Sequence, residues 1–167
     1  MDVPQGISFE VAGTALKAKG PKGELVYQYN PQLVKVEFKD GKIEVLPNAK
    51  KMTRKYHAAV NSVYAHVKSM FKGVSEGYEK KLAIVYAHFP ITVEIKGQDV
   101  FVKNFLGEKT PRKTKILPGA KVQVNGQEIV VSGSDKYAVG QTANNLLRTS
   151  YVGKRDERVF QDGIYLA

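Results

Sequence analysis

The segment 103–115 gathers five basic residues against one acidic residue. Gly107 and Pro111 interrupt it, which excludes a regular helix and predicts an exposed basic loop. Such a loop can lay its positive side chains along phosphate groups, whose contacts dominate nucleic-acid affinity without reading sequence. A solvated loop with no partner is the alternative interpretation. The candidate phosphate-binding side chains are Lys103, Lys109, Arg112, Lys113 and Lys115.

A second basic cluster follows the second predicted helix, with Tyr151 and Phe160 interleaved. Aromatic rings beside arginine can stack on unpaired bases of RNA. Anchoring of the tail on a sheet explains Phe160 equally well, so both interpretations stay open. The basic members of this cluster are Arg148, Lys154, Arg155 and Arg158.

The net charge supports a polyanionic partner. The 167 residues carry a formal charge of +10 and the isoelectric point is near 9.6, as in many nucleic-acid-binding domains. Residues 1–78 hold 12 basic and 7 acidic side chains, and residues 79–167 hold 14 and 9, so each half carries +5. The charge is therefore not confined to a detachable tail. A merely soluble basic protein remains the alternative.

Candidate metal-binding residues are not arranged in a known pattern. His57, His66 and His88 lack metal-ligand spacing, and there is no cysteine. No phosphate-binding P-loop occurs in the sequence. We therefore expect no metal, no cofactor, no small-molecule substrate and no enzymatic activity.

The compartment is predicted from the same sequence. The N-terminus lacks the basic-then-apolar pattern of a signal peptide. No apolar stretch approaches the roughly 18 residues that a spanning helix requires. The absence of cysteine fits a reducing compartment. We expect a cytosolic, soluble protein that does not contact membranes.

An internal repeat indicates the elements that must position these basic residues. Segment 7–13 (ISFEVAG) recurs as 91–97 (ITVEIKG), and both alternate apolar and polar residues as a half-buried strand does. Asp40-Gly41 and Asn125-Gly126 predict hairpin turns at equivalent places, because both residue types tolerate positive φ.

One amphipathic helix follows the strands in each half. In the first, an apolar stripe from Tyr56 to Met70 ends near Gly73, a candidate C-cap. In the second, Ser134 or Asp135 can cap the N-terminus. The stripe of the second helix consists of Val139, Ala143, Leu146 and Leu147. The predicted fold is α+β, with two tandem duplicated domains, 1–78 and 79–167, each a small antiparallel sheet packed against one helix.

Two short segments imitate known RNA-binding motifs. Residues 20–23 (GPKG) match the G-x-x-G loop of KH domains, but strand-like flanks favour a simple turn. Residues 99–105 (DVFVKNF) have the aromatic alternation of an RRM strand without its leading glycine motif. Both a stacking surface and the core stay open for Phe101, and we favour the core.

Three separate stretches resemble one known family. They are residues 73–82 (GVSEGYEKKL), 139–145 (VGQTANN) and 158–165 (RVFQDGIY). They occur in the same order in ribosomal protein six of the large subunit, in its archaeal and eukaryotic form. The resemblance covers essentially the whole chain.

The resemblance implies a structural constituent of the large ribosomal subunit. Its second half would grip large-subunit rRNA near the sarcin-ricin region, beside the docking surface of translational GTPases, and its partners would be that rRNA and neighbouring ribosomal proteins. Bacterial members end in a basic, glycine-rich tail, whereas this chain carries Asp162 there, so RNA contacts are not carried over to residues 161–167. The alternatives are a basic RNA-binding module outside the ribosome and a protein-interaction scaffold whose charge serves solubility.

Overall fold

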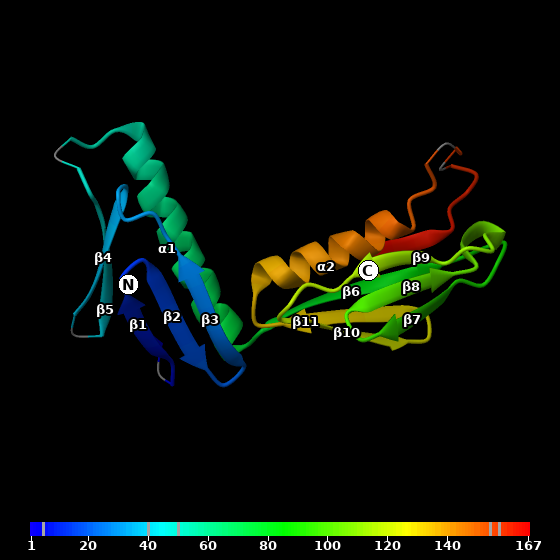
Figure 1. The fold of residues 1–167 in the computed structure, drawn as a ribbon, viewed down its shortest axis with the longest axis horizontal. Coiled ribbons are helices and arrows are strands. Elements are labelled where there is room, and N and C mark those ends of the chain that lie inside the picture. The colour runs from blue at the N-terminus through cyan, green and yellow to red at the C-terminus, as the bar shows by residue number, and fades with distance from the viewer. Residues whose placement is uncertain (5, 40, 50, 154, 157) are drawn as a thin grey trace. The chain divides into compact units, whose positions relative to one another are not determined.

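The computed structural model describes residues 1–167 except 5, 40, 50, 154 and 157. It divides into two compact units, Met1–Gly77 and Tyr78–Ala167, which are shown in Figure 1. Each unit has its own hydrophobic core. The units are therefore described separately.

Unit 1 contains two antiparallel sheets. The first has the order β1-β2-β3, formed by β1 (Ser8–Ala12), β2 (Ala15–Gly20) and β3 (Gly23–Gln28). The second is the hairpin of β4 (Val34–Lys39) and β5 (Lys42–Pro47). Gly41 adopts φ +73° in its turn, whereas Asp40 lies outside the described residues. The predicted hairpin at this place is confirmed.

The helix of unit 1, α1 (Arg54–Ser75), buries the predicted apolar stripe against both sheets. Val63, Val67 and Met70 are buried, and the stripe extends to Phe71 and Val74. The prediction that Gly73 caps the helix is wrong. Gly73 is a buried residue inside α1, and the backbone N–H of Glu76 closes the last turn on the Lys72 carbonyl.

Unit 2 also contains two antiparallel sheets. The larger has the order β10-β11-β6-β12, and the smaller has the order β7-β8-β9. The predicted hairpin between β10 and β11 is confirmed, with Gly126 at φ +62° in its turn. The strands are β6 (Tyr78–Val85), β7 (Thr92–Lys96), β8 (Asp99–Lys103), β9 (Arg112–Lys115), β10 (Ala120–Asn125), β11 (Glu128–Gly133) and β12 (Gly163–Leu166), and a short 3-10 helix, η1 (Phe105–Gly107), lies between β8 and β9.

The helix of unit 2, α2 (Lys136–Thr149), begins at Asp135, which caps it by accepting the backbone N–H of Tyr137 at 2.9 Å. Of the two predicted caps, Asp135 is therefore the one used. The predicted stripe is buried at Val139, Ala143 and Leu146. In Figure 1, α2 lies along one face of the larger sheet of this unit.

The α+β class and the duplication are confirmed. Each unit holds a three-stranded sheet of consecutive strands, a later hairpin and one helix. Unit 2 adds β6 and β12, which extend the hairpin sheet on the side of β11. The prediction of one sheet per half is too simple, because each unit divides its strands between two sheets. No helix of the described residues is long and apolar enough to cross a bilayer.

Candidate nucleic-acid interface

The predicted basic loop is partly a strand, so that prediction is wrong for residues 112–115. β9 pairs with β8 in antiparallel register, with Val102 opposite Arg112 and Phe101 opposite Lys113. Alternation along β9 turns Lys113 and Lys115 outward and Arg112 inward. Pairing with β8 satisfies the backbone groups that a loop would leave to water, which explains why the segment is ordered.

Arg112 is held by the protein itself. Its Nε and Nη2 donate to the two carboxylate oxygens of Glu108 at 2.8 and 2.6 Å. Its Nη1 donates to the carbonyls of Thr149 and Tyr151 at 2.9 and 2.8 Å. The guanidinium also covers the buried ring of Phe105, with Cζ 4.3 Å from the ring centre.

These contacts change the interpretation of Arg112. The side chain is only 28% exposed, and four N–H groups are already used. The hydrogen bond from Arg112 lowers the pKa of Glu108, against the opposing effect of burial. Arg112 therefore fastens β9 to the end of α2 rather than presenting a free charge.

The outer face of the smaller sheet carries two further predicted residues in ion pairs. Lys103 pairs with Glu94 at 2.6 Å, and Lys113 pairs with Asp99 at 2.8 Å. The two lysine side chains remain about half exposed, at 43% and 51%. Phosphate contact by either lysine would therefore compete with a neighbouring carboxylate.

The ring of Phe101 lies on this outer face and not in the core, so its predicted burial is wrong. Val100 and Val102, its neighbours in β8, are buried, whereas Phe101 is half-buried. Lys96 Nζ and Lys113 Nζ lie 5.7 and 5.6 Å from the ring centre. Strand alternation requires this outcome, because successive side chains point to opposite faces.

Five predicted residues are exposed and form no ion pair with a carboxylate in the described part of the chain: Lys109, Lys115, Arg148, Arg155 and Arg158. Lys109 lies in the connection before β9, Lys115 ends β9, and Arg148 lies in the last turn of α2. The Lys115 carbonyl accepts a hydrogen bond from Nδ2 of Asn145, a residue of α2, at 3.3 Å. The structure thus brings the end of the first basic segment beside the helix that carries the start of the second.

The remaining members of the second cluster lie between α2 and β12. Arg155 and Arg158 are exposed, whereas Lys154 lies outside the described residues. The guanidinium of Arg155 is 5.0 Å from the ring centre of the partly buried Phe160, which also lies near His88. Phe160 therefore contacts the protein, in agreement with an anchoring role.

The segment 161–167 is built into the fold. Asp162 is fully buried and accepts the backbone N–H groups of Ala87 at 2.8 Å and His88 at 3.4 Å. Burial raises the pKa of Asp162, but the hydrogen bonds from Ala87 and His88 outweigh it, so the pKa lies below its usual value. Gly163–Leu166 then pairs with β6 as β12. This tail is structural within the unit.

Two residues of α2 that secure β9 and the segment directly after it are missing from the sequence prediction. Thr142 is fully buried and accepts the backbone N–H of Leu117 at 3.1 Å, and Asn145 donates to Lys115 as described. In the sequence, both are recognisable as polar residues directly beside the apolar stripe of α2. Threonine and asparagine favour neither helix formation nor apolar packing. At such positions they therefore indicate a hydrogen bond to a neighbouring segment.

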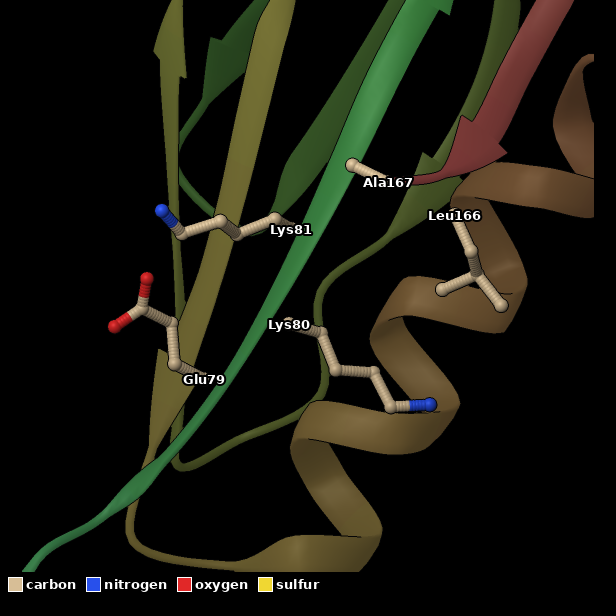
Figure 2. A pocket seen from close by; sticks show the side chains of 5 residues that line it. All are labelled: Glu79, Lys80, Lys81, Leu166 and Ala167. Atoms are coloured by element: carbon tan, nitrogen blue, oxygen red, sulfur yellow. The ribbon is translucent and has the colours of Figure 1, made fainter.

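Figure 2 shows a shallow hollow of unit 2 beside the end of β12. Lys80 points towards α2, whereas Glu79 and Lys81 point to the opposite side of β6. Lys81 pairs with Glu128 at 3.7 Å. Because these polar groups diverge, they do not form a convergent set around a ligand.

The comparisons with known proteins agree on one family. The sequence profile of Ribosomal protein L6 matches residues 3–77 and 89–163. Large ribosomal subunit protein uL6 of Ignicoccus hospitalis is 42% identical over 169 residues, covering 99% of this chain and 91% of that protein. The protein of the same name from Methanosarcina mazei is 43% identical over 166 residues, covering 99% and 93%. The two profile matches fall one in each unit, as expected for a duplication.

Proposed function

Because the chain belongs to the ribosomal protein L6 family, we propose that its second unit attaches it to large-subunit rRNA within the large ribosomal subunit. As a ribosomal protein it is a structural component and not an enzyme. Neighbouring ribosomal proteins complete its set of partners. The resemblance described above favours the sarcin-ricin region, beside the docking surface of translational GTPases, as the place of attachment.

The observation that supports this proposal best is the group of unpaired cations on unit 2. Lys109, Lys115 and Arg148 are exposed, and the described carboxylates leave them free to neutralise phosphates. Neutralisation releases counterions from the RNA, which is the main electrostatic source of affinity. The rigid sheet and helix hold the charges at fixed separations, so they can fit one folded RNA better than another.

The other predicted residues have secondary parts in this proposal. Lys103, Lys113, Arg155 and Arg158 widen the positive surface, although the first two must leave an ion pair to reach a phosphate. Arg112 contributes by holding β9, and with it Lys115, in place. Lys154 stays a prediction, because it lies outside the described residues.

The test is a triple substitution of Lys109, Lys115 and Arg148 by glutamine in the full chain. Binding to deproteinised archaeal large-subunit rRNA should weaken. If all three contact phosphates, the slope of log affinity against log salt should fall by about two to three units. A triple substitution of Lys51, Lys55 and Lys68, exposed residues of unit 1, makes the same charge change and serves as the control.

Two results would contradict the proposal. Equal losses in the two triple variants would mean that net charge alone drives binding. Absence of a tagged protein from large subunits in a sucrose gradient of an archaeal host would contradict a ribosomal role altogether.

A further inference from the structure

Gly140 lies in the middle of α2, and no contact within unit 2 requires a glycine at this position. A Cβ atom built on Gly140 meets nothing within 4 Å, and the residue has no positive φ. By contrast, the same construction on Gly133 meets the Gly119 carbonyl and Val139. Glycine weakens a helix interior relative to alanine, because it loses more backbone entropy on folding. Packing within the unit thus explains Gly133 but not Gly140.

The residues around Gly140 form one partly exposed face of α2. At 100° per residue, they fall within an arc of about 100°, opposite the buried stripe of Val139, Ala143 and Leu146. Tyr137 is 69% exposed, and the contacts of α2 within unit 2 are with β6, β9, β10, β11 and β12 on its other side. The face consists of Tyr137, Gly140, Gln141, Asn144 and Arg148.

The composition of this face is unusual for a solvated helix surface. α2 has no acidic residue in its sequence (KYAVGQTANNLLRT), so it forms none of the i,i+4 ion pairs that stabilise exposed helices. Gln141 Nε2 donates to Asn145 Oδ1 at 3.0 Å, which leaves Gln141 Oε1 available as an acceptor. The face therefore offers amide groups and one arginine around a position with no side chain.

Resting on the proposed rRNA binding, we propose that the sugar-phosphate backbone of the rRNA packs directly on α2 at Gly140. The missing side chain lets a ribose or phosphate approach the helix surface. Gln141 and Asn144 can bond the ribose 2′-hydroxyl, which is both donor and acceptor. Arg148, one turn beyond Asn144, neutralises a phosphate.

Charge decides in favour of RNA over a protein partner for this face. Arg148 and the neighbouring Lys136 and Lys115 give it only positive charge, and its amides add donors and acceptors without any carboxylate. Sugar and phosphate groups take up a large share of protein contacts to nucleic acids, mostly from basic and amide side chains. An apolar protein interface would require exposed aliphatic side chains, and on this face Tyr137 alone is apolar in part.

The experiment compares Gly140→Ala and Gly140→Gln in the full chain. Both should fold, and Gly140→Ala should raise the melting temperature of unit 2 by about 2–8 °C, because alanine favours the helix. Affinity for deproteinised archaeal large-subunit rRNA should fall stepwise with side-chain size. For Gly140→Gln the loss should reach about tenfold, since obstructing one neutral hydrogen bond to the ribose costs up to about that much.

The salt dependence of binding distinguishes a steric effect at Gly140 from the loss of a charge at Arg148. Gly140→Gln should lower affinity with an unchanged salt slope, whereas Arg148→Gln should reduce the slope by roughly 0.7–0.9. Ala65→Gln, at an exposed position of α1, makes a comparable change on a helix of unit 1 and should leave binding unaltered.

Each outcome bears on one proposal. If the parent chain binds the rRNA and Gly140→Gln binds equally well, contact at α2 is overturned while rRNA binding stands. If Gly140→Gln assembles poorly into subunits but binds naked rRNA normally, a neighbouring protein covers α2, and the inference is again overturned. If the parent chain does not bind the rRNA, the proposed function itself fails.

Discussion

Replacing Arg112 with glutamine should destabilise unit 2 by about 2–3 kcal/mol, because the guanidinium joins three parts of the fold. The substitution removes the pair with Glu108, the cover over Phe105 and both hydrogen bonds to the end of α2. Glutamine is too short to reach all of these groups. The main-chain carbonyls of Thr149 and Tyr151 would lose their donor.

The magnitude follows from the separate contacts. The two hydrogen bonds to main-chain carbonyls contribute about 1–2 kcal/mol together. The cation–π contact adds about 0.5–1 kcal/mol. The ion pair with Glu108 is partly exposed, so it adds only about 0.3–0.5 kcal/mol. In a unit of this size, the total corresponds to a fall in melting temperature of about 10–20 °C.

Native-state hydrogen exchange is the appropriate assay, because two units can unfold separately and a single global transition would mix them. Amides of β11 and α2 report unit 2, and amides of β2 and α1 report unit 1. Protection should fall in the first group and stay unchanged in the second.

Two variants serve as controls for Arg112→Gln. Lys109→Gln removes a nearby exposed charge and should change stability by less than about 0.5 kcal/mol. Arg112→Lys keeps the charge but lacks the forked donors, so it should recover only a minor part of the loss. If Arg112→Gln loses no more protection than Lys109→Gln, the assignment of Arg112 as a structural residue is refuted.

Three further predictions concern unit 2. Gly133→Ala should destabilise it by about 1–3 kcal/mol, because the new Cβ meets the Gly119 carbonyl; unchanged amide protection in β11 would contradict this. Asp162 has a lowered pKa in the folded state, so its stabilising effect is present above about pH 4 and is lost as the pH falls further. Asp162→Asn should therefore reduce the loss of stability as the pH falls below about 4. Glu79→Gln is the control and should leave this pH dependence as in the parent. The same pH dependence in Asp162→Asn and in the parent would contradict the prediction. Residues 79–167 expressed alone should fold and keep most rRNA binding, and stronger binding by residues 1–78 would reverse the assignment.

The elements that could be predicted from sequence are those with local signals. Apolar alternation identified β1 and β7, glycine-containing turns identified both hairpins, and Asp135 was one of two named caps. Each signal lies within a few residues of the element that it specifies. Tertiary contacts did not need to be known.

The errors arise where distant residues decide the structure. β9 is short and polar, and it is a strand because β8 pairs with it and α2 secures it. The carbonyl partners of Arg112 lie 37 and 39 residues further along the chain. Composition shows that 103–115 is basic, but it does not show which charges the fold already uses.

The pairing of β12 with β6 has a consequence for synthesis of the protein. The first and last strands of unit 2 are neighbours, with Val85 opposite Gly163 and Leu82 opposite Leu166. At about 5–20 residues per second, several seconds pass between the emergence of the two strands. During this time one edge of β6 stays open to any extended chain nearby. In the sheets of unit 1, only strands that are consecutive in the sequence pair with each other. Unit 1 can therefore finish folding before β12 of unit 2 has been synthesised.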